Sequence, residues 1–198
     1  ISLLPHWRGA SPLEYSLMNG DKETGVSIIK LVEKIDSGPI MASKSIKLDS
    51  NINKTDLIKK INLIGTKLLI STLPKIFNKK ISYKNQDHNE ATYAYKISSD
   101  LRKLDFSKNA EDIHNKIRAF ADEPGAWFSY KNERIKIIKS NFIKGKWMNS
   151  IIINEKFHIG CGDGKICPEI IQKEGRNTMY LEDFLRGFKF DIGTKVNE

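Results

Sequence analysis

One aspartate of this sequence, in the segment IDSGP, has a side chain that can do acid–base chemistry. Asp36 stands on a predicted tight turn, where Gly38 allows an unusual φ angle and Pro39 stiffens the chain that leaves the turn. A carboxylate held in this way can orient an imidazole or handle a proton. It can also simply cap the turn, because Asp-x-Gly sequences form side-chain-capped turns often. On local spacing alone, turn capping is the favoured interpretation.

The first residues combine an apolar run with turn residues. Ile1 to Leu4 is apolar except for Ser2, and Pro5 and Gly9 mark the turn that leaves it. Because a chain terminus is usually polar and loosely held, we interpret this run as the end of a buried segment inside a working site. His6 is predicted to be a solvated loop histidine.

Positive charge is concentrated in two clusters. The sequence has 33 Lys and Arg against 24 Asp and Glu, a net charge of +9, which favours a polyanionic partner. Heavy use of Lys, Ile and Asn is also what an AT-rich genome encodes. Lys54–Lys84 contains eight lysines and one acid, and Lys131–Lys146 contains six basic residues and one acid. Both clusters are candidate phosphate-facing surfaces, with ordinary solvated faces as the alternative.

Composition excludes several classes of protein. Hydrophobic residues make up 39% of the 198 residues and charged residues 29%, which indicates a globular chain. No stretch approaches the roughly 18 apolar residues of a membrane span, and no signal-peptide pattern is present, so we expect a cytoplasmic protein without a membrane partner. Cys161 and Cys167 lack zinc-ligand spacing, and the histidines are scattered, so no metal is expected.

The first half of the chain predicts an α/β arrangement. Asn19-Gly20 ends a short helix, Gly25–Val32 has the β-branched content of a strand, and a second strand follows the Asp36 turn. Thr55 is the expected cap of a long helix, and Pro74 marks the end of this helix or a kink. Its apolar positions recur at three- and four-residue steps: Leu57, Ile58, Ile61, Ile64, Leu68 and Leu69.

The second half has a different pattern. The polar stretch from Asn78 to about Asp100 is the best candidate for a boundary. One helix over 109–120 is followed by short strands separated by turns, including a hairpin turn at Asp163-Gly164, and by a last short helix. This pattern predicts a five- or six-stranded small barrel with helical appendages. Three aromatic residues are expected in its core: Phe120, Trp127 and Phe128.

Two groups of segments resemble a known family across nearly the whole chain. SLLPHWRGASPLEYSLMNGDKETGVSI with EKIDSGPIM is similar to the 10-formyltetrahydrofolate-dependent formyltransferases. TYAYKISSDLRKLDFSKNAEDIHNKIRAF with GDGKICPEIIQKEGRNTMYLEDFLRG resembles the C-terminal part of the methionyl-tRNA formyltransferases within that family. The resemblance implies the remnant of a Rossmann-like catalytic domain at 1–85, a linker at 86–100, and an OB-like β-barrel domain with helices at 101–198 that binds tRNA.

The resemblance also implies a reaction. The family transfers the formyl group of 10-formyltetrahydrofolate to an amine, here the α-amine of methionine on initiator tRNA. In the family an Asn-x-His motif precedes Ser-Leu-Leu-Pro and stabilises the tetrahedral oxyanion. Ile1 then falls directly after that His, which implies an N-terminally truncated chain that is inactive alone. Asp36 matches the family's catalytic aspartate, and in combination with the opening motif the catalytic interpretation becomes the favoured one.

Binding residues follow from the same resemblance. Ser2, Leu3, Leu4 and Pro5 match the folate-binding segment, where apolar side chains line the pterin and backbone groups pair with its polar edge. A basic face of the second domain would grip tRNA phosphates, with strong salt dependence. The candidates for tRNA contact are Arg8, Lys79, Lys80, Lys84, Lys131, Arg134, Lys136 and Lys139. A monomer without a metal is expected.

Two further hypotheses remain open. A sugar-nucleotide formyltransferase or a formyltetrahydrofolate hydrolase shares the folate site and has a similar second domain. A non-enzymatic alternative is a tRNA-binding module that carries only part of a folate pocket.

Overall fold

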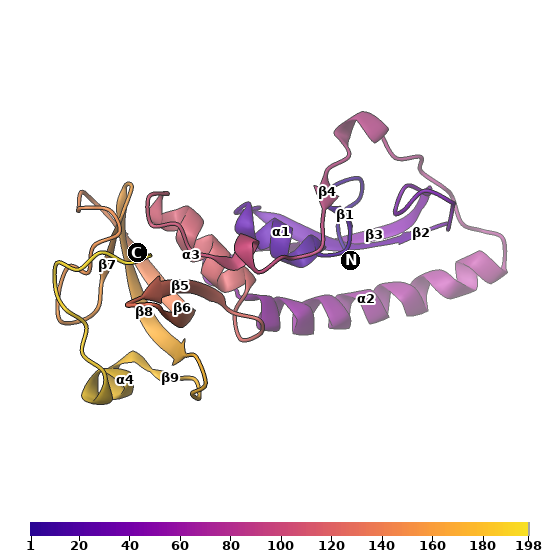
Figure 1. The fold of residues 1–198 in the computed structure, drawn as a ribbon. Helices are drawn as coiled ribbons and strands as arrows, with labels where there is room; N and C mark the ends of the chain where they lie inside the picture. Colours follow the sequence, from indigo (N-terminus) through magenta and orange to yellow (C-terminus); the bar gives the residue numbers. More distant parts are fainter. Residues whose placement is uncertain (198) are drawn as a thin grey trace. The chain divides into compact units, whose positions relative to one another are not determined.

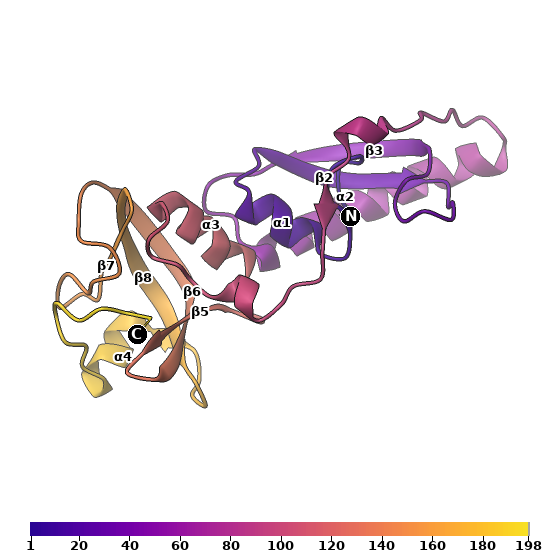
Figure 2. The same ribbon diagram turned by 45° about the horizontal axis from the view of Figure 1, so that its top comes forward.

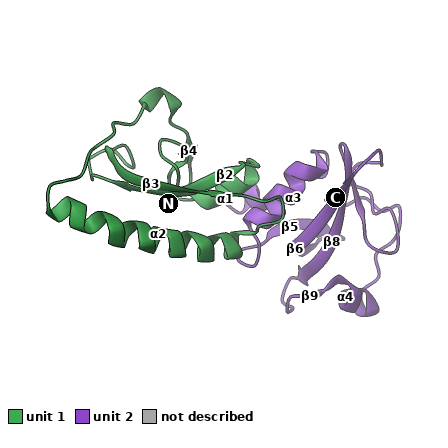
Figure 3. Cartoon of the chain, turned by 180° about the vertical axis from the view of Figure 1, so that it is seen from behind, with its two compact units in different colours: residues 1–97 green, residues 98–198 purple. Residues whose placement is uncertain are grey.

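The computed structural model describes residues 1–197, and the chain divides into two compact units, the first ending at Ile97 and the second beginning at Ser98 (Figure 3). Each unit has its own buried core, and each is described by itself. Within the described part of the chain, no helix is both long and apolar enough to cross a membrane.

Unit 1 is a two-stranded antiparallel sheet packed on a long helix. Strand β2 (Glu23–Ile29) pairs with β3 (Ile40–Lys47), and helix α2 (Lys54–Phe77) runs alongside both strands (Figures 1 and 2). A short helix, α1 (Pro12–Met18), packs against α2. The buried residues Leu17, Leu57 and Ile61 form the centre of this core. The expected strand–turn–strand–helix order is therefore present.

Helix α2 differs from the expectation at its N-terminal end. Its cap is Asn53, whose side chain accepts a hydrogen bond from the backbone N–H of Asp56 at 2.9 Å, and Thr55 lies inside the first turn. The predicted Thr55 cap is therefore wrong, because an Asn two residues earlier already satisfies the free N–H. Pro74 lies within the helix, which continues to Phe77.

A second strand pairing within unit 1 joins its opening loop to the segment of residues 86–97. Strand β1 (Arg8–Gly9) pairs in parallel with β4 (Tyr93–Ala94), after a 3₁₀ turn, η1 (His88–Glu90). The N–H of Arg8 donates to the carbonyl of Thr92 at 2.9 Å, and that of Ala10 to Ala94 at 2.8 Å. This short ladder holds the opening loop against a segment about 85 residues away in sequence.

Unit 2 is built on a five-stranded antiparallel sheet in the order β5-β6-β8-β7, with β9 also paired to β8. The strands are β5 (Ala126–Tyr130), β6 (Glu133–Lys144), β7 (Ile159–Cys161), β8 (Gly164–Lys173) and β9 (Met179–Tyr180). A 3₁₀ turn, η2 (Asp100–Arg102), and the helices α3 (Ala110–Ala119) and α4 (Leu181–Gly187) complete it.

Helix α3 and aromatic rings form the core of unit 2. Ile113 and Ile117 are buried on α3, which packs on β6. Phe128 meets Phe106 edge to face and stacks near Phe157, with ring centroids 5.7 and 5.9 Å apart. The expected core positions Phe120, Trp127 and Phe128 are all buried, which confirms that they serve packing.

The predicted hairpin turn at Asp163-Gly164 connects β7 and β8. Asp163 also accepts a hydrogen bond from the backbone N–H of Ala110 at 2.8 Å and so caps α3 from the hairpin. Cys161 and Cys167 are free thiols, and burial raises the pKa of Cys161 to about 12. Within residues 1–197, no cluster of His, Cys, Asp and Glu has the arrangement of a metal site.

Candidate active site

The turn that carries Asp36 is held by hydrogen bonds from outside it. Asp36 adopts a left-handed φ of 53°, and its Oδ2 accepts a hydrogen bond from the backbone N–H of Gly9 at 2.8 Å. The N–H of Lys30 donates to the carbonyl of Pro39 at 3.0 Å and closes the loop. The half-buried carboxylate is therefore fixed against the opening loop, whose residues lie 27 positions earlier in the sequence.

Gly38 serves a different purpose from the expected one. The left-handed φ of this turn belongs to Asp36, and Gly38 is absent from the residues with positive φ in the described chain. A Cβ at Gly38 would lie 1.8 Å from the carbonyl oxygen of Lys30. Gly38 is thus required because the backbone of Lys30, directly after β2, approaches it closely, and the expectation of an unusual φ there is wrong.

Gln86 connects the same turn to a buried arginine. Gln86 is 7% exposed and Arg8 is 1% exposed. The Oε1 of Gln86 accepts hydrogen bonds from Nε and Nη2 of Arg8 at 3.2 and 2.7 Å, and Nη2 of Arg8 lies 3.0 Å from Nδ1 of His88. The Nε2 of Gln86 donates to the carbonyls of Asp36 and Gly38 at 2.9 and 2.6 Å. Arg8, considered above for tRNA contact, is instead enclosed within unit 1.

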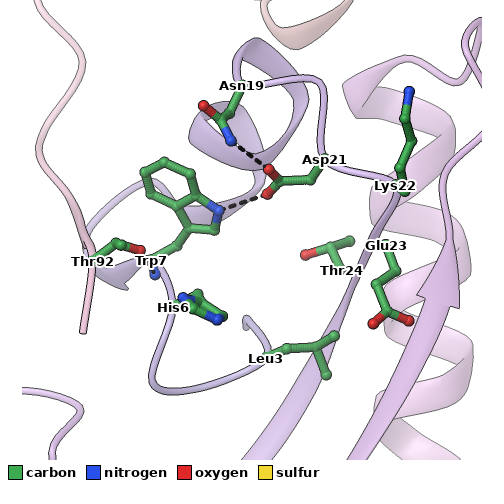
Figure 4. Close-up of a pocket in the computed structure, with 9 residues that line it drawn as sticks. All are labelled: Leu3, His6, Trp7, Asn19, Asp21, Lys22, Glu23, Thr24 and Thr92. Carbon is green, nitrogen blue, oxygen red and sulfur yellow. Dashed lines mark hydrogen bonds between the residues drawn. The ribbon is translucent and has the colours of Figure 1, made fainter. Parts of the chain in front are cut away.

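The segment Ser2–Pro5, which matches the family's folate-binding segment, lies at the start of the opening loop. Ser2 is buried, and Leu3 lines a cavity of about 490 Å³ together with Trp7 and Thr24 (Figure 4). In that cavity the indole N–H of Trp7 donates to Asp21 at 2.7 Å, and the exposed His6 stands beside it. The size and the mixed lining of the cavity are typical of a small-molecule site.

Backbone groups of this segment already have partners. The hydroxyl of Ser27 donates to the carbonyl of Ser2 at 2.8 Å and accepts from the N–H of Leu4 at 3.2 Å. The carbonyl of Leu3 accepts from the N–H of His6 at 3.1 Å. Apolar side chains, rather than these three backbone groups, are thus available to line a flat ligand.

A second cavity of about 380 Å³ lies next to the Asp36 turn. Gly9, which donates to the Asp36 carboxylate, and Ile35 both line it. Tyr93 and Tyr95, both exposed, contribute aromatic rings. Its lining also includes the cationic side chains Lys34 and Lys96 and no acidic residue. A ligand with an aromatic group and a negative charge suits this lining.

The basic candidates of unit 2 differ in how far their charges are already paired. Lys131 contacts Asp191 at 2.6 Å and Lys139 contacts Glu169 at 2.7 Å. In each case the hydrogen bond to the carboxylate is the main factor that raises the pKa of the lysine. The guanidinium of Arg134 stacks on Trp127 at 4.0 Å. Lys136 follows Arg134 on the same side of β6, opposite the buried Ile135 and Ile137, so it is the better placed of the lysines for a new anionic partner.

The remaining candidates, Lys79, Lys80 and Lys84, lie on the exposed segment after α2. Lys84 pairs through its backbone with Ile40, at 2.8 and 2.9 Å. The described structure thus places the charged ends of these lysines in solvent, at the end of unit 1 that follows α2.

Three residues of this site escaped prediction from the sequence: Gln86, His88 and Thr92. All three belong to the polar stretch that the sequence presents as a linker, and each makes its contact with Trp7 or Arg8 about 80 residues away. The one local signal was the change from polar to aromatic residues at Tyr93 and Tyr95.

Two family models match the chain. "Formyl transferase" matches residues 1–73, and "Formyl transferase, C-terminal domain" matches residues 96–189. The chain is similar to the methionyl-tRNA formyltransferase of Sinorhizobium fredii, with 35% identity over 98% of this chain and 64% of the relative. Identity to the methionyl-tRNA formyltransferase of Wolbachia pipientis subsp. Culex pipiens is 38%, over 100% of this chain and 64% of the relative. The chain thus spans 64% of the length of each of these two relatives.

Among solved structures, the chain is similar to the N-formyltransferase of Helicobacter canadensis, determined in complex with folinic acid and dTDP-3-aminofucose. Their identity is 26%, the TM-score is 0.70, and the match covers 87% of this chain and 64% of that one.

Proposed function

Because the chain belongs to the formyltransferase family, we propose that it takes part in formyl transfer from 10-formyltetrahydrofolate to the α-amine of methionine on initiator tRNA. The observation that carries the proposal is the hydrogen bond from the N–H of Gly9 to the carboxylate of Asp36. This hydrogen bond joins the loop that begins with Ser2–Pro5 to the turn that carries Asp36. Two stretches that resemble the family separately thus meet at one place.

We assign the chemistry of this chain to Asp36. In the reaction the amine nitrogen bonds to the formyl carbon, the bond from that carbon to N10 of the folate breaks, N10 gains a proton and the amine loses one. A carboxylate beside the reacting amine can orient an imidazole and accept the released proton. The Asn-x-His motif to which the resemblance assigns the oxyanion has no counterpart among residues 1–198.

We assign the two cavities to the two substrates. Leu3 and its neighbours would hold the folate in the cavity of about 490 Å³, with Ser2, Leu4 and Pro5 shaping the loop around it. The cavity of about 380 Å³ beside the Asp36 turn would take the aminoacyl end of the tRNA, since its lysines suit a phosphate and its tyrosines suit a base.

The domain assignment belongs to the same proposal. Residues 1–85 would form the second part of a Rossmann-like catalytic domain, 86–100 the linker, and 101–198 an OB-like domain that binds tRNA. In support, the two family models match on either side of residues 74–95. The antiparallel sheet of unit 2 also presents cationic side chains on the outer side of β6.

The amine acceptor distinguishes this function from that of the sugar-modifying relatives. The full gene product that contains residues 1–198 should formylate methionyl-tRNA, and it should leave dTDP-3-aminofucose unmodified under the same conditions. Formylation of the sugar nucleotide but not of the aminoacyl-tRNA would reverse the assignment.

The polypeptide of residues 1–198 alone provides the matched comparison. We expect it to bind tRNA with an affinity that falls steeply as salt rises, while formyl transfer stays at background. Formyl transfer by this polypeptide would mean that another group replaces the Asn-x-His motif.

Lys136 tests the proposed tRNA surface. Replacement of Lys136 by Gln should weaken tRNA binding and lower the slope of log affinity against log salt by about one, because one phosphate contact is lost. Lys156→Gln, at an exposed lysine away from β6, is the control and should leave the slope unchanged. Equal slopes for both variants would exclude Lys136 from the contact surface. A salt titration of tRNA binding by fluorescence anisotropy measures both.

A further inference from the structure

Both polar atoms of the Gln86 side chain make hydrogen bonds near the Asp36 turn. Its carbonyl oxygen accepts two hydrogen bonds from Arg8, and its amide nitrogen donates two, to the carbonyls of Asp36 and Gly38. An amide side chain has two donor hydrogens, so both donors of Gln86 are committed to this turn. Because Gln86 is only 7% exposed, water cannot readily replace these hydrogen-bond partners.

Arg8 fixes the orientation of the Gln86 amide. Arginine only donates hydrogen bonds, so the atom of Gln86 that faces Arg8 must be oxygen, and the nitrogen must face the turn. Nη2 of Arg8 also lies 3.0 Å from Nδ1 of His88. Because a guanidinium that is 1% exposed sets this orientation, the amide cannot flip without loss of all four hydrogen bonds.

The turn needs such support because its backbone is strained. Asp36 has a φ of 53°, a left-handed conformation that L-residues adopt rarely. The carbonyls that Gln86 holds belong to Asp36 itself and to Gly38, two residues later. From the other side, Gly9 holds the Asp36 carboxylate. The backbone of the aspartate is therefore fixed by Gln86 and its side chain by Gly9, and Arg8, which holds Gln86, is the neighbour of Gly9 in sequence.

We propose that Gln86 is a positioning residue for formyl transfer: held by the buried Arg8, it fixes the backbone of the turn and so the direction of the Asp36 carboxylate. The inference rests on the proposed function, because it assigns to Gln86 an effect on the reaction. We call the hydrogen bonds of Gln86 with Arg8, Asp36 and Gly38 the clamp. The clamp is a structural arrangement, so it can be observed in a protein that does not transfer formyl.

Gln86→Glu is the most direct variant. Glutamate keeps the length of the side chain and an acceptor for Arg8, and it pairs with the charge of Arg8, so unit 1 should still fold. It loses both donors and places a carboxylate oxygen against the carbonyls of Asp36 and Gly38. The turn should move, and kcat for formyl transfer should fall by about 10²-fold, as expected for a displacement on the order of 1 Å. KM for each substrate should stay within about threefold, because no binding group is removed.

Gln172→Glu is the matched control. The amide of Gln172 in unit 2 also donates to a backbone carbonyl, that of Arg176, at 2.8 Å. This variant should keep kcat, the KM for the folate and the melting temperature of the unmodified protein. A change in kcat of similar size in both variants would assign the effect to charge rather than to the turn, and would overturn the proposal.

Amide resonances distinguish failure of the clamp from failure of the proposed function. In protein labelled with [¹⁵N]glycine, Gln86→Glu should shift the signals of Gly9 and Gly38 and leave that of Gly187 in place. Unshifted Gly9 and Gly38 signals overturn the clamp, whether or not the protein transfers formyl. Shifted signals with unchanged kcat in an active protein overturn the positioning role, and a protein without formyl transfer refutes the proposed function alone.

If Gln86→Glu does not fold, hydrogen exchange in the unmodified protein tests the clamp instead. The side-chain amide protons of Gln86 should then exchange with solvent far more slowly than those of Gln172, which lies nearer the surface. Equal exchange rates would contradict the clamp.

Discussion

Replacement of Gly38 by alanine is expected to destabilise unit 1 by about 3 kcal/mol and to abolish most of the formyl transfer, since the turn backbone must shift. The added Cβ would lie 1.8 Å from the carbonyl oxygen of Lys30 and 3.0 Å from its carbon. Both atoms belong to the backbone of Lys30, so they cannot move aside as the end of a flexible side chain could. The carbonyl of Gly38 is also a partner of Gln86, and a displaced turn loses that hydrogen bond.

Gly65→Ala is the matched control within the same unit. A Cβ at Gly65 would meet only Val26, at 3.5 and 3.7 Å, which is ordinary contact. Because alanine is a better helix former than glycine, this variant should raise stability by about 0.5–1 kcal/mol. Thermal unfolding followed by circular dichroism measures both variants. Equal melting temperatures for Gly38→Ala and the unmodified protein would show that the close approach at the turn is not present in solution.

Elements whose signals are local in sequence could be predicted. The turn at Asp36 lies between two strands, as the positions of Gly38 and Pro39 indicated, and the hairpin at Asp163-Gly164 connects β7 with β8. Helix α3 follows from its own amphipathic pattern. The reason in each case is that residues a few positions apart determine the conformation. Where two residues compete for one role, as Asn53 and Thr55 do for the cap of α2, local pattern does not decide.

The contacts around Asp36 could not be predicted, because they join distant segments. Gly9 lies 27 residues before Asp36, and Gln86 lies 48 and 50 residues after its two carbonyl partners. Nothing in the composition of the polar stretch around Gln86 distinguishes it from a solvated linker. Arg8 shows the same limit, since a guanidinium next to a turn looks like a surface cation until its partners are known.

Charge clusters in the sequence also conceal their partners. Lys131 and Lys139 lie in a stretch with one acid, yet the fold brings Asp191 and Glu169 to them from other strands and loops. Exposed ion pairs of this kind are weak, so a phosphate can replace the carboxylate at little cost. The sequence predicted the basic surface, and the structure shows which of its charges are already paired.

Replacement of Asp36 by asparagine is expected to slow formyl transfer by about 10³-fold while the fold is kept. Asparagine retains an oxygen for the N–H of Gly9 and the same side-chain length, so the turn keeps its hydrogen bond. It has no negative charge, and so it can neither stabilise an imidazolium nor accept the proton that the amine releases. The loss should therefore appear in kcat, with KM for folate and tRNA almost unchanged.

Asp49→Asn separates catalysis from turn capping. Asp49 is an exposed aspartate of unit 1 whose Oδ1 accepts a hydrogen bond from the N–H of Asn51 at 2.9 Å. The two aspartates would respond alike if Asp36 only stabilised its turn. Asp49→Asn should leave the rate of formyl transfer within about twofold of the unmodified protein.

The most direct test is the single-turnover rate of formyl transfer from 10-formyltetrahydrofolate to methionyl-tRNA, measured for the full gene product and for its Asp36→Asn and Asp49→Asn variants. We predict a loss on the order of 10³-fold for Asp36→Asn alone, at an unchanged melting temperature. A rate for Asp36→Asn within about tenfold of that of the unmodified protein would contradict the assignment of the chemistry to this carboxylate.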